Sequence, residues 1–215
     1  MRKIQKGESP KWFEAWKDNF QCKKGRRATY KEDFPDAERR KLRKELLEEQ
    51  GYICCYCMKR IDINSSHLEH FWPKSRFKNL DMDYQNMLVS CEGETTGGDH
   101  CGHKKDDWYD KDMVIPTDDK IETMFRYALS GGINPAHRGE KEAVEKKMIH
   151  EWGLDSFHLE RNRKMALAET EIFEMQDYTE EEVWDTIAYY DGRQDGKYIE
   201  YCNVIIDVMK REMLQ

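Results

Sequence analysis

The sequence predicts an α+β fold in which a small metal-organised segment lies between mainly helical N- and C-terminal regions. Five of the seven cysteines and four of the seven histidines fall within residues 52–110. That segment has several glycines and few long apolar runs, so bound metal rather than a large apolar core is expected to organise it. On both sides of it, apolar residues recur at the three- and four-residue spacing of amphipathic helices.

Residues 1–50 are predicted to form a basic helical arm. A first short helix is expected to begin at Ser9 and Pro10, because serine caps helices well and proline fits their first position. Residues 21–34 are expected to be an irregular basic loop, followed by a second helix from about Asp36 to Gln50. The expected apolar residues are Trp12, Phe13 and Trp16 in the first helix, and Leu42, Leu46 and Leu47 in the second.

Residues 117–215 are predicted to form a helical subdomain that docks a protein partner. Helices are expected over residues 140–152 and 156–176, where apolar side chains recur every three or four positions. Thr179 and Glu182 have the residue types and spacing of a capping box, which predicts the start of a further helix. The last helix is expected to bear Tyr198, Tyr201, Ile205, Val208 and Met209.

Charge is distributed unevenly along the chain, which has a net charge of −7. Residues 1–60 contain 17 lysines and arginines against 10 acidic residues, so the rest of the chain carries the acidic excess. A basic face for a polyanion and an acidic region for protein contact would explain this division, and so would ordinary solvated surfaces. Neither a run of 18 apolar residues nor an apolar leader segment occurs, so we expect a cytoplasmic protein that does not cross a membrane.

Four cysteines are spaced to hold a structural zinc (Zn) ion. Cys54 and Cys57 form a Cys-x2-Cys pair, and this spacing on a tight turn points two thiolates at one metal. Cys91 and Cys101 can supply the second pair, because the glycine-rich loop between them can fold back. Four thiolates would close the coordination shell, as in structural rather than catalytic zinc sites. His100 remains an alternative to Cys101 as the fourth ligand.

Three polar elements fall in order between and after these cysteine pairs. Glu69 and His70 are adjacent, Asn86 precedes an apolar stretch, and His103 lies at an expected helix start. Neighbouring side chains on a straight strand point to opposite faces, so Glu69 and His70 can reach one site only if the strand bends. A neutral imidazole can remove a proton at cytoplasmic pH, and carboxylates and imidazoles bind divalent ions. His67, two residues before Glu69, is expected to be structural or to face the substrate, and metal binding by His67 is the less favoured alternative.

The order of a Cys-x2-Cys pair, Glu-His, Asn, two further cysteines and His resembles the HNH endonucleases that carry a zinc knuckle. The similarity extends over about residues 1–110 to the PtuB-type HNH proteins of Septu and retron antiphage systems, chiefly through residues 51–57 and 69–75. It implies a ββα-metal nuclease core within residues 51–116, in which two strands and a helix clamp one divalent ion. It also implies an ATPase partner of the PtuA type and a role in defence against phage.

Carried over to this sequence, the resemblance implies a role for each polar element. His70 would be the general base, oriented by Asn86, and Glu69 and His103 would hold a catalytic Mg or Mn ion. One departure from the family pattern leaves the last ligand open between His103 and a neighbour, because Gly102 separates His103 from the last cysteine.

The expected reaction is hydrolysis of a phosphodiester bond, with DNA as the expected substrate. Basic side chains are expected to neutralise the flanking phosphates; they are Lys74, Lys104, Lys105, Arg39, Arg40 and Arg43. RNA, for example tRNA, is the alternative substrate, because a single-metal site contacts the phosphate rather than the sugar. A zinc module that binds nucleic acid without cutting it is a further alternative, and so is an adaptor that contacts only protein.

Overall fold

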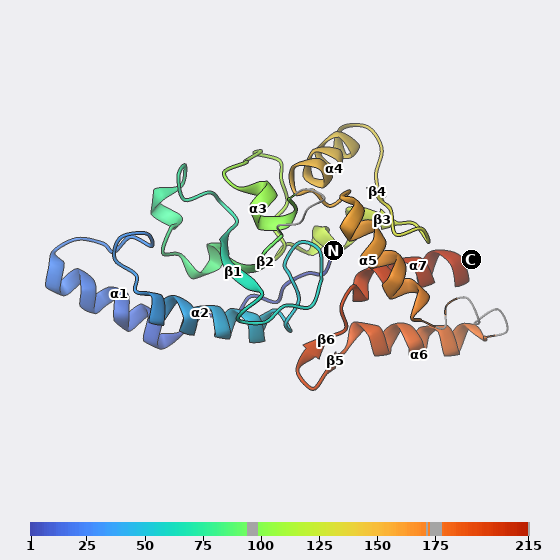
Figure 1. Ribbon diagram of the computed structural model, residues 1–215, viewed down its shortest axis with the longest axis horizontal. Coiled ribbons are helices and arrows are strands. Elements are labelled where there is room, and N and C mark those ends of the chain that lie inside the picture. The colour runs from blue at the N-terminus through green and yellow to red at the C-terminus, as the bar shows by residue number, and fades with distance from the viewer. Residues whose placement is uncertain (94–98, 171, 173–177, 215) are drawn as a thin grey trace.

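The computed structural model describes residues 1–93, 99–170, 172 and 178–214. Figure 1 shows an elongated molecule in which the N-terminal helices lie at one end and the last helices of the chain lie at the other. A two-stranded sheet and a short helix lie between them. This arrangement confirms the predicted α+β fold, a small central core flanked by mainly helical regions.

Helix α1 (Lys11–Lys24) begins one residue later than the serine-proline pair predicts, with Pro10 rather than Ser9 at its N-cap, and it also ends later than expected. The prediction that a loop begins at residue 21 is wrong, because the helix continues to Lys24. Gly25 then adopts a left-handed conformation with φ of 67° and donates its N–H to the Gln21 carbonyl, 2.8 Å away. Glycine ends a helix in this way without steric cost, so Gly25 sets the boundary.

Helix α2 (Asp36–Glu49) lies where the sequence predicts it and buries its three leucines, Leu42, Leu46 and Leu47. It contacts both strands of the central sheet. The Arg43 guanidinium donates to the carbonyl oxygens of Ile63 and Ser66, at 2.9 and 2.6 Å. This arginine therefore ties α2 to the start of the sheet.

The central unit consists of two antiparallel strands and a short helix. Strand β1 (Ser66–His70) pairs with strand β2 (Met87–Cys91), with Ser66 opposite Cys91 and His70 opposite Met87. The connection between them contains two 3-10 turns, η1 (Lys78–Leu80) and η2 (Tyr84–Asn86). Helix α3 (Cys101–Lys105) follows and packs on β2. The order of these elements is that of the predicted ββα core.

The C-terminal region contains the helices α4 (Glu140–Glu151), α5 (Phe157–Ala168), α6 (Glu180–Asp191) and α7 (Cys202–Met213). The capping box at the start of α6 is confirmed, since the side chains of Thr179 and Glu182 each accept a hydrogen bond from the other's backbone N–H. Helix α5 is shorter than predicted, because it ends at Ala168. Residues 171 and 173–176 of the predicted helix lie outside the described residues.

Two small hairpins interrupt the region that is predicted to be helical. They are formed by β3 (Phe125–Tyr127) with β4 (Ile133–Pro135), after the 3-10 turn η3 (Asp119–Thr123), and by β5 (Arg193–Gln194) with β6 (Lys197–Tyr198). Tyr198 therefore lies on a strand rather than on the last helix. Strands of two or three residues are too short to show an alternating pattern, so periodicity does not reveal them.

One contiguous core draws on residues from the whole chain. The Ile4 backbone N–H donates to the Pro116 carbonyl at 2.8 Å, and the Met1 amino group donates to the Tyr127 hydroxyl at 2.9 Å. The division into residues 1–50, 51–116 and 117–215 stays a prediction. No helix in the described ranges is both long enough and apolar enough to cross a membrane.

Candidate metal centre

Four cysteine side chains converge beside the central sheet. Cys54 and Cys57 lie on a tight turn closed by the bridge between Ile53 and Arg60. Cys91 ends β2 and Cys101 begins α3. All four are buried, and their sulfur atoms lie within 4.8 Å of one another, with Cys57 and Cys91 at 3.9 Å. Tetrahedral zinc with Zn–S bonds of about 2.3 Å places sulfurs about 3.8 Å apart, so the cluster fits a zinc ion.

The backbone at Cys101 is held in an uncommon conformation. Its φ is 58°, in the left-handed region that residues with a side chain rarely adopt. Its N–H donates to the Trp152 carbonyl at 2.7 Å, which anchors the residue from the C-terminal region. The structure thus places the Cys101 sulfur in the cluster although the glycine-rich loop before it is only partly described.

His100 and Cys55 border this cluster without belonging to it. The His100 Nδ1 lies 3.2 Å from the sulfur of Cys101 and 3.8 Å from that of Cys91, at hydrogen-bonding distance for sulfur. The group that converges consists of the four cysteines, so the geometry favours Cys101 over His100 as the fourth ligand. Burial raises the pKa of Cys55 well above its usual value, which keeps this spare thiol neutral.

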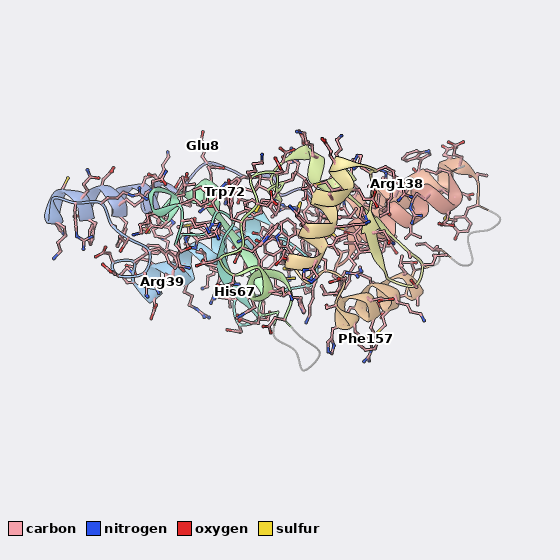
Figure 2. The ribbon with its side chains drawn as sticks, turned by 90° about the horizontal axis from the view of Figure 1, so that it is seen from above. Glu8, Arg39, His67, Trp72, Arg138 and Phe157 are labelled. Carbon is pink, nitrogen blue, oxygen red and sulfur yellow. The ribbon has the colours of Figure 1, made fainter. Side chains whose placement is uncertain are left out.

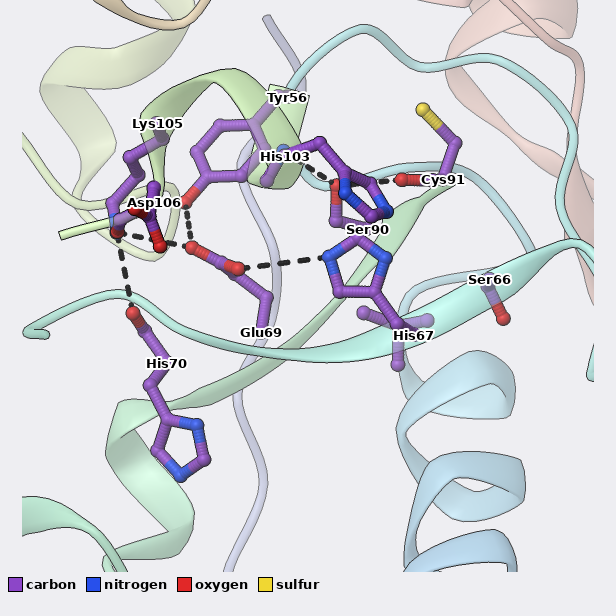
Figure 3. Close-up of polar contacts among 12 residues, drawn as sticks. Tyr56, Ser66, His67, Glu69, His70, Ser90, Cys91, His103, Lys105 and Asp106 are labelled. Carbon is purple, nitrogen blue, oxygen red and sulfur yellow. Dashed lines mark hydrogen bonds and ion pairs between the residues drawn. The ribbon is translucent and has the colours of Figure 1, made fainter. Parts of the chain in front are cut away.

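Glu69 lies at the centre of a buried polar network on β1 (Figure 3). Its Oε1 accepts a hydrogen bond from the Tyr56 hydroxyl at 2.8 Å and forms an ion pair with the Lys105 ammonium at 3.0 Å. Its Oε2 faces the His67 Nε2 at 3.8 Å. Burial opposes ionisation, but the interactions with His67, Lys105 and Tyr56 outweigh it and hold the pKa of Glu69 below its usual value. Glu69 is therefore a buried carboxylate with fixed partners.

Lys105 is fully buried, which overturns its predicted contact with phosphates. Besides Glu69, its ammonium group donates to the backbone carbonyls of His70 and Asp106, at 3.3 and 3.4 Å. Lys104, the preceding residue, is exposed. On a helix of five residues, neighbouring lysines face different sides, so only one of the two can reach a ligand in solution.

Substitution of Lys105 by methionine is expected to lower the free energy of unfolding by about 3 kcal/mol or more. The change leaves the Glu69 carboxylate buried without its ion-pair partner, a loss that outweighs the apolar packing gained. Chemical denaturation measures this directly. The matched variant Lys104→Met removes an exposed lysine and is expected to change stability by less than about 0.5 kcal/mol. Equal effects of the two substitutions would contradict the buried pairing.

A second cluster of metal-binding side chains lies on the same side of β1 as Glu69. It consists of His67, Glu92 and His103, whose ligand atoms all lie within 4.8 Å of one another. The Glu92 Oε2 is 3.3 Å from the His103 Nε2 and 3.8 Å from the His67 Nδ1. The two imidazole rings meet edge to face, with centroids 4.8 Å apart. Figure 2 places His67 near the middle of the long axis of the molecule.

The structure does not bring His70 into this cluster. Figure 3 shows its ring pointing away from the Glu69 carboxylate, as expected for neighbours on a strand that does not bend. Its Nε2 lies 2.9 Å from the Asp81 carbonyl oxygen, and its ring packs edge-on against Tyr30. A carbonyl only accepts, so Nε2 carries the proton and Nδ1 keeps its lone pair. Burial lowers the pKa of His70 to about 4, which keeps the imidazole neutral at pH 7.

Asn86 holds the backbone that follows His70. Its Oδ1 accepts from the Trp72 N–H at 2.7 Å, and its Nδ2 donates to the carbonyls of Trp72 and Leu80, at 3.0 and 3.1 Å. The Asn86 carbonyl accepts from the Phe71 N–H at 3.1 Å. All these bonds go to backbone groups. Asn86 therefore fixes the chain just after His70, at Phe71 and Trp72, and at Leu80, next to the Asp81 carbonyl that the ring contacts.

The other five predicted phosphate-binding residues divide into two groups. Lys74, Lys104 and Arg40 are exposed and available to a polyanion. Arg39 and Arg43 are only partly exposed, and each donates to two backbone carbonyls. Arg39 donates to the carbonyls of Tyr30 and Lys31, at 2.7 and 3.1 Å. Both arginines therefore have structural roles that the prediction did not include.

The sequence predicts one member of the second cluster, His103, offers His67 only as a less favoured ligand, and does not single out Glu92. His67 is two positions before Glu69, and residues two apart on a strand share a face, so the strand period places these two together. Glu92 follows the last residue of β2, where no motif marks it. Its placement depends on the strand register, which the sequence does not state.

The chain is similar to two proteins, one of a retron and one of a Septu system. The chain is 34% identical over 128 residues to a retron Vc95 protein of Vibrio cholerae serotype O1 biovar El Tor that is provisionally named an HNH endonuclease. It is 34% identical over 93 residues to the Septu protein PtuB of Bacillus thuringiensis. No family model matches the chain.

The matched segments cover 55% and 40% of this chain, and 59% and 34% of the respective relatives. The chain thus matches less than two thirds of each relative's own length. The names of both relatives confirm the resemblance to HNH proteins of the Septu and retron type.

Proposed function

We propose that the protein is a metal-dependent HNH endonuclease that hydrolyses phosphodiester bonds in DNA as part of an antiphage defence system. The observation that carries the proposal is the ββα unit itself, in which β1 ends on Glu69 and His70 and α3 presents His103 beside a four-cysteine cluster. The similarity to proteins named for HNH endonuclease and Septu functions supports it.

The four-cysteine cluster would serve as a structural zinc site. The ββα unit is small, and its helix has only five residues, so a bound ion would add to the packing of its buried strand β2. A zinc ion held by Cys54, Cys57, Cys91 and Cys101 would join the end of β2 to the start of α3 and to the turn after Ile53. Its role would be to hold the catalytic side chains in place, since four thiolates leave no open coordination position.

His70 would act as the general base. Its neutral imidazole, with the Nε2 proton donated to the Asp81 carbonyl, offers Nδ1 to accept a proton from the attacking water. Asn86 would keep this ring in place through the backbone on either side of it. A divalent cation bound beside α3, where the resemblance implies Glu69 and His103 as ligands, would stabilise the charge on the leaving 3′ oxygen. The exposed Lys74, Lys104 and Arg40 would contact neighbouring phosphates.

The acidic remainder of the chain would repel nucleic acid and is better suited to a protein partner. We propose an ATPase of the PtuA type as that partner, and the cytoplasm as the place of action. RNA remains the second candidate substrate, because the proposed contacts involve phosphate and not the sugar.

The test is purification of the native complex, followed by cleavage assays on DNA and RNA with Mg²⁺ or Mn²⁺. Cutting of DNA in the presence of the added ion, and not in its absence, is the expected result. Cutting of RNA alone would replace the substrate and keep the mechanism. A zinc-loaded complex that cuts neither polymer would overturn the proposal in favour of a binding module.

The pH dependence of cleavage is expected to extend to unusually low pH. His70 works as a base only when neutral, and burial lowers its pKa from 6.5 to about 4, so kcat/KM should stay level from pH 8 to about pH 5. Below that it should fall as His70 becomes protonated. The measurement is a pH profile of kcat/KM with zinc content checked at each pH. A midpoint near 6.5 at constant zinc content would show a base exposed to solvent and contradict this assignment.

A further inference from the structure

His67, Glu92 and His103 offer the geometry of a divalent-metal site. Ligand atoms bound at about 2.1 Å to an octahedral ion lie about 3.0 Å apart when adjacent and about 4.2 Å apart when opposite. The Glu92 Oε2 lies 3.3 and 3.8 Å from its two imidazole neighbours, within this range. The Glu92 side chain is 51% exposed, and those of His67 and His103 are 27% and 32% exposed, so the site is open to solvent and to a substrate.

A polar atom in this cluster lacks a hydrogen-bond partner. The His67 Nδ1 is buried and, within the described part of the chain, makes no hydrogen bond. It faces the Glu92 carboxylate at 3.8 Å, too far for a hydrogen bond but suitable for a shared ion. The other ring nitrogen, Nε2, faces the anionic Glu69. Metal-binding histidines commonly direct their second nitrogen to a carboxylate in this way, which leaves the first as a metal ligand.

Gly102 leaves the space that the His67 ring occupies. A Cβ atom at this position would lie 2.5 Å from the His67 Nε2 and 2.9 Å from the Glu69 Oε2. Any residue with a side chain here would therefore displace the imidazole. The departure of this chain from the family pattern, a glycine after the last cysteine, thus coincides with a histidine that fills the same space from β1.

We infer that His67, Glu92 and His103 together bind one first-row transition-metal ion in preference to Mg²⁺, and that Glu69 orients His67 instead of binding the ion. The Glu69 carboxylate is already occupied by Lys105 and Tyr56 on one oxygen and faces His67 with the other. Two imidazoles and one carboxylate are softer donors than the oxygens that Mg²⁺ prefers, and they favour Mn²⁺ and the later ions.

This inference rests on the proposed function for its purpose but not for its test, because metal binding is measured without substrate. Mn²⁺ titration of the full chain loaded with one zinc ion per chain, followed by electron paramagnetic resonance or calorimetry, is expected to show one Mn²⁺ site. Mg²⁺ should displace Mn²⁺ from this site only weakly. The substitutions His67→Ala, Glu92→Gln and His103→Ala are each expected to weaken Mn²⁺ binding at least about tenfold, with unchanged zinc content. The matched control His150→Ala removes an exposed histidine on α4 and should leave binding unchanged.

Two further variants test whether His67 binds the ion and Glu69 only orients it. Gly102→Ala should weaken Mn²⁺ binding by displacing His67, while the protein stays folded, since alanine is a better helix former than glycine. Glu69→Gln keeps an oxygen facing the His67 ring but removes its charge, so it should weaken Mn²⁺ binding less than loss of any of the three ligands does. Unchanged affinity in either His67→Ala or Glu92→Gln would overturn the inference, and so would equal affinity for Mg²⁺ and Mn²⁺.

The outcomes also separate this inference from the proposed function. A chain that binds Mn²⁺ through the three residues but cuts neither DNA nor RNA keeps the metal site and loses the nuclease. A chain that cuts DNA while Glu92→Gln leaves Mn²⁺ affinity unchanged keeps the nuclease and overturns the three-residue site.

Discussion

Replacing Cys57 with serine is expected to release the zinc ion and unfold the segment around the ββα unit. The four sulfurs converge from three separate parts of the chain, so the ion would cross-link these segments in addition to the apolar core that they share. Structural zinc contributes about 10–16 kcal/mol of binding free energy in small domains, comparable to the whole stability of a typical domain. Metal analysis together with circular dichroism measures the two losses.

Cys55→Ser is the matched control for this substitution. Cys55 is also buried and lies two residues away, but it is outside the group of four converging sulfurs. Serine there should cost only about 1–3 kcal/mol, the penalty of burying a hydroxyl group, and leave one zinc ion per chain. Full zinc content in the Cys57→Ser protein would contradict the zinc site.

Replacing His70 with alanine is expected to reduce the cleavage rate by about 10²–10⁴-fold, the usual contribution of a general base. The ring is buried against Tyr30 and makes one hydrogen bond, to the Asp81 carbonyl, so its removal should cost stability without unfolding the protein. Cleavage rates are therefore compared well below the melting temperature, with zinc content and Mn²⁺ affinity measured on the same samples. Both should match the unmodified protein.

Unchanged activity in the His70→Ala protein would show that another residue is the general base. His70 points away from the cluster of His67, Glu92 and His103. In that case His67 or His103 would be the candidate general base. A fall in rate accompanied by loss of zinc would instead reflect damage to the fold.

Local patterns predicted a large part of this structure. The Cys-x2-Cys spacing and the glycine-rich loop before Cys101 anticipated a cluster that the folded chain does form. The capping box at Thr179 and the leucines of α2 likewise marked real helices, because caps and apolar stripes act within a few residues of one another.

The remaining features depend on contacts between distant parts of the chain. Lys105 lies in a run of two lysines that looks solvated, yet the turn of α3 directs it onto Glu69, which is 36 positions earlier in the sequence. Glu92 joins His67 and His103 only because β1 and β2 pair in one particular register. The orientation of His70 depends on whether β1 bends, which the residue types do not determine.

The measurement that tests the central claim most directly is cleavage of labelled DNA and RNA by the zinc-loaded protein and its His70→Ala variant, side by side. Each is assayed with its native partner, after removal of loosely bound ions and again after addition of Mn²⁺. The expected result is cleavage that requires the added ion and is about 10²–10⁴-fold slower in the His70→Ala variant. Cleavage of neither polymer by a zinc-loaded, Mn²⁺-binding protein, or equal cleavage by both proteins, would contradict it.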